Sequence, residues 1–249
     1  MIRDVLAAAQ FLTRIPIELR DEPDLGAAVP WFPFVGALIG ASIGAVAAAL
    51  LELTPAAVAA AVAIVIGLLI TGAFHEDGLA DTADALGGLT PERRREILKD
   101  SRHGSYGVAA MCSTIVLRIV CVAALGPAVA FAGLVAAHTL GRGAAVAAMA
   151  TARPAPHGGL GADHARGLSR RSASLGVLGA LAIGALATGW WIGPLAMAAA
   201  VAAVIVVRLA HRAFGGISGD LLGAVEQVGE CLVLVVVTAL ALRHRLWWT

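Results

Sequence analysis

Seven stretches of about twenty mostly apolar residues dominate the sequence and restrict the folds that are open to it. A helix needs about 20 such residues to cross the ~30 Å hydrocarbon core of a bilayer. Only 14% of the residues are charged, against ~25% in soluble domains, so charges are too few to cover a water-facing surface. The sequence therefore predicts an all-α integral membrane protein, a polytopic bundle of about seven transmembrane helices forming one domain over residues 1–249. The expected spans lie near residues 31–51, 55–74, 107–126, 128–150, 173–192, 194–214 and 221–242.

The segment before the first span has a different character from the spans. The first twenty residues mix apolar side chains such as Leu6 and Phe11 with the basic Arg3 and Arg14. Such a mixture is typical of an amphipathic helix that lies on the membrane surface. We therefore expect an N-terminal amphipathic segment.

The polar loops and their basic residues predict the orientation in the membrane. The polar loops lie near residues 75–106, 151–172 and 212–220. Lys and Arg gather in the first two of these loops and in the N-terminal segment, whereas the turns at 52–54 and 126–127 contain none. Because Lys and Arg favour the cytoplasmic side, we expect these loops to face the cytoplasm. With seven spans, Arg243 and Arg245 fall on the opposite side, against this rule.

Charge and residue spacing limit the possible partners. The net charge is +1, which gives no electrostatic reason to expect nucleic acid as a partner. The three cysteines lie in apolar stretches and form no disulfide framework or zinc-site spacing. Gly36, Gly40 and Gly44 share one helix face, which permits close helix contact and leaves a homo-oligomer possible.

A run of carboxylates at the end of the second span is the sharpest chemical feature. Asp77, Asp81 and Asp84 are spaced i, i+4 and i+7, so on a helix they share a face, where like charges repel. A hard divalent cation offsets such repulsion, and Mg²⁺ commonly binds through carboxylates together with substrate phosphates. A solvated acidic helix cap explains Glu76 or Asp77 but not a stripe that reaches Asp84, so we favour a metal site. His75 and Glu76 add further ligands or a general base.

A basic loop that contains glycine follows the carboxylates. Arg102, His103, Gly104 and Gly107 lie where this loop returns to the membrane. Their guanidinium, imidazole and backbone N–H groups can hold phosphates. The Arg triplet at 93–95 is interpreted instead as an orientation signal.

Ionisable residues inside membrane spans are costly and usually functional. They are Arg118, His138, Arg142, Arg208, Glu226 and Glu230. Arg142 and Arg208 can pair with carboxylates or contact an anionic substrate, and a structural ion pair is an equal alternative for Arg118 and Arg208. His138, alone on an apolar helix, is interpreted as a buried core histidine.

A second acidic set follows the last polar loop. Asp220 opens a helix on which Glu226 and Glu230 are one turn apart and face the same way. Carboxylates buried together need a cation or an Arg partner. This set is predicted to start on the same side as the first one, so we expect Asp220 and Glu230 to join it as metal ligands.

Five blocks of the sequence carry a family resemblance. They are 11–16 (FLTRIP), 31–36 (WFPFVG), 75–84 (HEDGLADTAD), 97–107 (ILKDSRHGSYG) and 215–220 (GGISGD) followed by Gly223, Ala224 and Glu230. Together, and in this order, they resemble cobalamin synthase, the adenosylcobinamide-GDP ribazoletransferase family. The blocks run from residue 11 to residue 230, so the resemblance covers almost the whole chain.

The resemblance implies an activity and a location. The family transfers the adenosylcobinamide phosphate of adenosylcobinamide-GDP to α-ribazole or its 5′-phosphate and releases GMP, with Mg²⁺ as cofactor. The products, adenosylcobalamin or its 5′-phosphate, complete the nucleotide loop. The implied setting is the cytoplasmic (inner) membrane, with the lipid bilayer around the chain and the active site facing the cytoplasm.

Sequence and resemblance together assign roles to individual residues. The expected metal ligands are Asp77, Asp81, Asp84, Asp220 and Glu230. The expected catalytic residues are His75, Glu76 and Asp81, and the expected substrate-binding residues are Arg14, Arg102, His103, Gly104, Arg142 and Arg208.

Two other functions compete with this interpretation. A CDP-alcohol phosphotransferase also carries an Asp-rich motif at a membrane helix end, but that motif expects Arg where Asp81 stands and further residues that are missing. A transporter would explain intramembrane Arg and Glu, but it predicts polar residues on broken helices at mid-bilayer.

Overall fold

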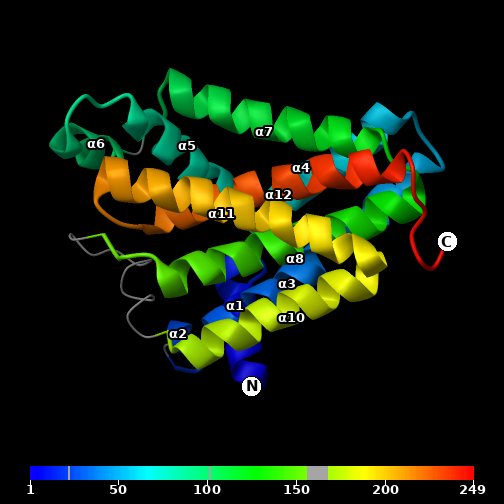
Figure 1. Cartoon of the computed structure of the whole chain (residues 1–249), viewed down its shortest axis with the longest axis horizontal. Helices are drawn as coiled ribbons and strands as arrows, with labels where there is room; N and C mark the ends of the chain where they lie inside the picture. Colours follow the sequence, from blue (N-terminus) through cyan, green and yellow to red (C-terminus); the bar gives the residue numbers. More distant parts are fainter. Residues whose placement is uncertain (22, 101, 156–167) are drawn as a thin grey trace.

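The computed structural model describes residues 1–21, 23–100, 102–155 and 168–249, and these residues form helices with one isolated β-bridge. The helices are α1 (Ile2–Leu12), α2 (Leu25–Ala28), α3 (Phe32–Leu51), α4 (Ala56–Thr71), α5 (Phe74–Leu86), α6 (Pro91–Ile97), α7 (Ser105–Ala123), α8 (Pro127–Thr151), α10 (Arg170–Thr188), α11 (Ile192–Phe214) and α12 (Gly219–Ala241). Two 3₁₀ turns, η1 (Val29–Trp31) and η2 (Gly189–Trp191), lead into α3 and α11. Figure 1 shows the long helices lying side by side along the long axis of the molecule, with α5 and α6 at one end.

The number of membrane passes follows from the helix lengths. By length and hydropathy, five described stretches can cross a membrane, or six if the bent pair α4–α5 counts as one. One of the five, Arg170–Phe214, has 45 residues and contains both α10 and α11. At 1.5 Å per residue it would extend over about 68 Å, more than twice the bilayer core, and Figure 1 shows α10 and α11 running in opposite directions. Each expected span therefore coincides with a described helix, and the all-α polytopic bundle is confirmed.

The first expected polar loop, near 75–106, is largely helical. The first half of this segment forms α5, which runs in a different direction from α4, and its middle forms α6. The Thr90 hydroxyl accepts a hydrogen bond from the Arg93 N–H (3.2 Å), and Pro91 fills the first position of α6. This capping explains a helix where polarity alone indicated a loop. Of the loop expected near 151–172, residues 156–167 lie outside the described residues, and the third loop, near 212–220, shrinks to the segment between α11 and α12.

The glycine stripe packs α3 against α8. A Cβ on Gly36 would lie 2.5 Å from the carbonyl oxygen of His138, and one on Gly40 would lie 2.5 Å from that of Leu134. Only glycine permits so close an approach between the two backbones. The stripe is therefore buried within one chain and is not a surface for self-association.

A sharp bend separates α4 from α5. The two helix axes meet at 89°, and the residues between them, Gly72 and Ala73, have φ values of 67° and 54°. The left-handed conformation is unusual for Ala and costs ~1–2 kcal/mol. The bend is covered by the segment after α1, where the Arg14 backbone N–H donates to the Ile70 carbonyl (2.7 Å). It turns α5 and its carboxylates across the end of the bundle.

The two ends of the bundle differ in chemistry. The C-terminal segment folds back at the end opposite α5 and α6, where the Trp248 indole N–H donates to the Ala187 carbonyl (2.9 Å). Arg243 and Arg245 lie at this end too, as the seven-span count predicts. The N-terminal helix α1 buries Ala7, Ala8 and Leu12 against the bundle, while Ile2 remains 75% exposed.

Candidate active site

Two carboxylates of α5 meet one imidazole at the end of the bundle. The His103 Nε2 lies 3.3 Å from an Asp77 oxygen, and its Nδ1 lies 3.4 Å from an Asp81 oxygen. One ligand atom from each of the three residues lies within 4.8 Å of the other two. This spacing is suitable for a single metal ion.

Asp220 joins these residues from the first turn of α12. Helices α5 and α12 pack closely at Gly78: a Cβ there would lie only 2.9 Å from the Asp220 carbonyl oxygen, so the absence of a side chain allows the contact. The Asp220 carboxylate is near enough to interact electrostatically with both Asp77 and Asp81. Asp77, Asp81, Asp220 and His103 are called the aspartate cluster below. Their repulsion is only partly relieved by one imidazole, so the cluster favours a cation.

Asp84, the third residue of the carboxylate stripe, faces the start of α7. Its carboxylate accepts hydrogen bonds from the backbone N–H groups of Gly104 (2.6 Å) and Gly107 (2.8 Å). A carboxylate at a helix N-terminus also interacts favourably with the helix dipole. Asp84 thus fixes the loop that carries His103, and Gly104 takes part through its backbone.

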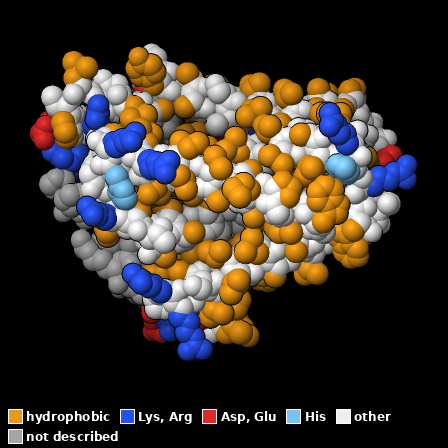
Figure 2. Space-filling view, in the orientation of Figure 1, with side chains coloured by type: hydrophobic (Ala, Val, Ile, Leu, Met, Phe, Trp, Pro, Cys, Tyr) orange, Lys and Arg blue, Asp and Glu red, His pale blue; other side chains and the backbone are white. Residues whose placement is uncertain are grey.

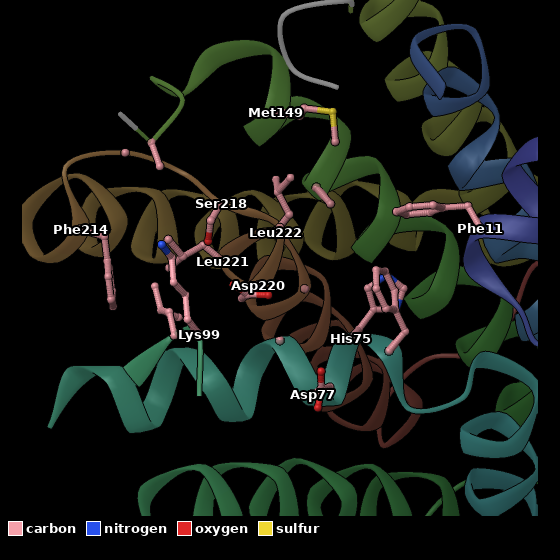
Figure 3. Close-up of a pocket in the computed structure, with 18 of the residues that line it drawn as sticks. Phe11, His75, Asp77, Lys99, Met149, Phe214, Ser218, Asp220, Leu221 and Leu222 are labelled. Atoms are coloured by element: carbon pink, nitrogen blue, oxygen red, sulfur yellow. The ribbon is translucent and has the colours of Figure 1, made fainter. Parts of the chain in front are cut away.

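A cavity of about 660 Å³ opens beside the aspartate cluster. This volume is in the ~300–1,000 Å³ range of ligand pockets. Asp77 and Asp220 line it together with His75, and in Figure 3 Asp220 lies between His75 on one side and Lys99 on the other. Part of the wall is aromatic, since Phe11 stacks on Phe32 at 5.4 Å between ring centroids. The cavity therefore combines carboxylates with an apolar wall.

Helix α6 brings cations to the same cavity. Arg94 fastens this helix by donating to the carbonyls of Gly88 (2.9 Å) and Ala213 (3.3 Å). Arg95 and Lys99 then line the cavity. Sequence reasoning assigned neither residue to the site, because it interpreted the Arg triplet that contains Arg95 as an orientation signal and chose Arg102 and His103, not Lys99, from the loop that follows; the i, i+4 spacing of Arg95 and Lys99 was the available clue.

A buried ionic network lies behind the cavity. Arg118 on α7 donates to Glu76 (2.8 Å) and to Glu230 (3.2 Å). Arg142 on α8 contacts Glu226 (2.6 Å) and Glu230 (3.0 Å). All five side chains are at most 4% exposed. Of the two partners expected for the paired carboxylates of α12, a cation or an Arg, the structure shows Arg.

Two histidines complete this network. His138 contacts Glu230, and His75 Nδ1 lies 3.7 Å from a Glu226 oxygen. Three carboxylates face two guanidinium groups, so one protonated imidazole would make the set neutral. His75 and Arg142 both line the cavity as well, so they connect the network to it.

Several predicted site residues are placed away from the aspartate cluster. Glu76 and Glu230 belong to the buried network; Glu230 is ten residues from Asp220 on α12, about 15 Å along the helix. The expected convergence of Asp220 and Glu230 on one metal is therefore wrong for Glu230, because its carboxylate is held by Arg118 and Arg142.

Three predicted substrate-binding arginines also lie apart from the cluster. Arg102 has a side chain that is 87% exposed and is paired with Asp100 (2.8 Å). Hydrogen bonds from Arg102 lower the pKa of the Asp100 carboxyl to about 2. Arg14 lies beside the bend at Gly72, and Arg208 lines a separate cavity between α8, α10 and α11.

Comparisons with known proteins agree along the length of the chain. A model of the family described as cobalamin-5-phosphate synthase matches residues 4–238. A protein of Ralstonia nicotianae named adenosylcobinamide-GDP ribazoletransferase is 40% identical over 247 residues, 95% of each chain. Proteins with the same name from Bradyrhizobium diazoefficiens and Azorhizobium caulinodans are 39% and 37% identical, over 96% and 98% of this chain and 94% and 98% of their own. No solved structure matches.

Proposed function

The chain belongs to the cobalamin-5-phosphate synthase family, and from this premise we propose that it transfers adenosylcobinamide phosphate from adenosylcobinamide-GDP to α-ribazole or its 5′-phosphate. The ribose 3′-hydroxyl attacks the corrinoid-side phosphorus, the pyrophosphate bond breaks, and GMP leaves. The observation that carries the proposal is the aspartate cluster, which stands at a cavity lined by both cations and aromatic rings.

Mg²⁺ fits the cluster as cofactor. Its carboxylates supply the hard oxygen ligands that this ion prefers, and an ion would relieve their mutual repulsion. We assign Asp77, Asp81 and Asp220 as ligands. When bound, Mg²⁺ neutralises charge on the pyrophosphate oxygens. Asp84 positions the His103 loop through its two backbone hydrogen bonds, which explains its place in the stripe without a ligand role.

The proton of the attacking hydroxyl goes to His75 in this proposal. His75 lines the cavity, as Asp77 does, whereas Glu76 does not line it and is paired with Arg118 (2.8 Å). Glu226, 3.7 Å from the His75 ring, offsets the positive charge that the ring gains, although it is also paired with Arg142. Glu76 then acts as a positioning residue: it holds Arg118, which in turn pairs with Glu230.

The phosphates of the donor are held by positive groups of the cavity. Arg95, which is also paired with Glu92 (2.7 Å), reaches it from α6, Lys99 reaches it from the turn after α6, and the N-terminus of α12 at Gly219 also lines it. Helix N-termini bind phosphates through their free N–H groups. The stacked rings of Phe11 and Phe32 form an apolar part of the same cavity wall.

We also propose that this end of the bundle faces the cytoplasm. The basic residues of α6 lie at the same end as the cavity, and Lys and Arg favour the cytoplasmic side. A cytoplasmic membrane location gives nucleotide substrates direct access to the cavity. Labelling of a cysteine introduced at Arg93 in inside-out but not right-side-out vesicles would support this orientation, and the reverse pattern would reject it.

The reaction is tested with purified protein in nanodiscs. It is supplied with adenosylcobinamide-GDP, α-ribazole and Mg²⁺, and the products are identified by mass spectrometry. We expect adenosylcobalamin and GMP in equal amounts, loss of both with EDTA, and recovery when excess Mg²⁺ is added. A folded sample that forms neither product would reject the proposal, and CDP-alcohol donors serve as the specificity control.

A further inference from the structure

A second cavity lies on the outer surface of the membrane-spanning bundle. It has a volume of about 460 Å³ and is enclosed by α8, α10 and α11. Its floor is made of small residues such as Gly143 and Ala180, and its α11 rim carries Ala200 and Ala203. None of its residues lines the cavity beside the aspartate cluster, so this groove is a separate feature.

The groove has the dimensions of one membrane leaflet. On α11 it extends from Ala196 to Arg208, twelve residues apart, or about 18 Å along the helix. Half of a ~30 Å hydrocarbon core is about 15 Å. Figure 2 shows hydrophobic side chains over the middle of this face and Lys and Arg towards its ends, so the groove lies in the apolar band.

One end of the groove is positively charged. Arg208 is exposed there, at the end of α11 nearest the aspartate cluster, and the structure gives it no ion pair within the described residues. No described carboxylate lines the groove. Basic pockets between transmembrane helices are suited to anionic lipid headgroups, and the long Arg side chain can reach the interface.

We propose that this groove binds one anionic phospholipid. An acyl chain lies along α11 over Ala200 and Ala203, and the phosphate pairs with Arg208. The groove is apolar along its length and cationic at one end, which is the charge pattern of a lipid and not that of a nucleotide. This assignment gives Arg208 a role although it does not face the aspartate cluster, and it does not rest on the proposed catalytic function.

Native mass spectrometry of the protein released from nanodiscs tests the assignment. The nanodiscs contain equal amounts of phosphatidylglycerol and phosphatidylcholine. For the wild-type protein we expect one tightly retained phosphatidylglycerol, at least about fivefold over phosphatidylcholine. Arg208→Gln should abolish this preference, and Ala200→Leu, which fills the groove, should lower retention of both lipids.

Arg212→Gln is the matched control, because Arg212 is on the same helix one turn away, is exposed and does not line the groove. It should retain phosphatidylglycerol as the wild type does. Equal retention of the two lipids by the wild type would overturn the proposal. So would an equal loss in both Arg variants, or a lipid-free dimer that Ala200→Leu dissociates.

Discussion

Replacing Arg118 with Met should strongly destabilise the bundle. The guanidinium of Arg118 is 4% exposed and donates to Glu76 and Glu230, at 2.8 and 3.2 Å. Met keeps much of the side-chain volume but leaves both carboxylates with less positive charge around them. Arg142 remains on Glu230, whereas Glu76 loses the one ion pair that the structure describes for it.

The size of the effect follows from burial. Removing one partner of a buried ion pair costs ~3–5 kcal/mol, a large share of a typical stability of ~5–15 kcal/mol. For a chain of this size, 1 kcal/mol shifts Tm by ~2–4 °C, so Arg118→Met should lower Tm by about 6–20 °C. Adding Glu76→Gln removes the stranded charge and should restore at least half of the loss.

Thermal unfolding in detergent measures both effects as a double-mutant cycle. Arg243→Met is the matched control, because this Arg is exposed at the far end of the bundle, and its Tm should change by less than about 2 °C. If Arg118→Met behaves like this control, or if Glu76→Gln lowers its Tm further, the buried network does not hold the helices as described.

Two further predictions concern the cavity and the α7 cap. Lys99→Gln should raise KM for adenosylcobinamide-GDP about tenfold with little change in kcat, because a charge-assisted hydrogen bond is worth ~1.5–3 kcal/mol. Arg93→Gln, outside the cavity, should change neither constant. Steady-state kinetics of the two variants measure both constants. Gly107→Ala should lower Tm, because its Cβ would clash with the Asp84 carboxylate and lie 2.8 Å from a carbonyl oxygen, at a cost of ~1–3 kcal/mol. Gly179→Ala, whose Cβ meets no atom within 4 Å, should keep or raise Tm, and equal effects of the two changes would contradict the packing at Gly107.

The helices could be predicted because bilayer thickness imposes a length on each apolar segment. Each expected span coincides with a described helix, and the glycine stripe correctly indicated close helix packing. The sequence could not show which helix packs against the glycine stripe, because a stripe of three glycines does not specify its partner. The structure shows that the partner is α8 of the same chain, where His138 and Leu134 present their backbone carbonyls.

The site was predicted in part, for reasons of geometry. Helical spacing brought Asp77 and Asp81 together, and the acidic set after the last polar loop supplied Asp220; His103 was singled out from its basic loop, but as a phosphate-binding residue. Spacing could not show that Asp84 turns to the start of α7, because that depends on where the chain returns after α6. Nor could the spacing show what binds the Glu230 carboxylate. Its partners, Arg118 and Arg142, come from helices that are distant from α12 in the sequence.

The most direct test of the aspartate cluster is the kcat/KM of Asp81→Asn with saturating Mg²⁺. Asp100→Asn is the control, because the Asp100 carboxyl, whose pKa of about 2 keeps it charged, lies outside the cluster. We predict a fall of at least about 10²-fold for Asp81→Asn with an unchanged Tm, the loss expected when one group that stabilises transition-state charge is removed, and full activity for the control. If Asp81→Asn kept more than half of the wild-type activity, the cluster would not be the centre of phosphoryl transfer.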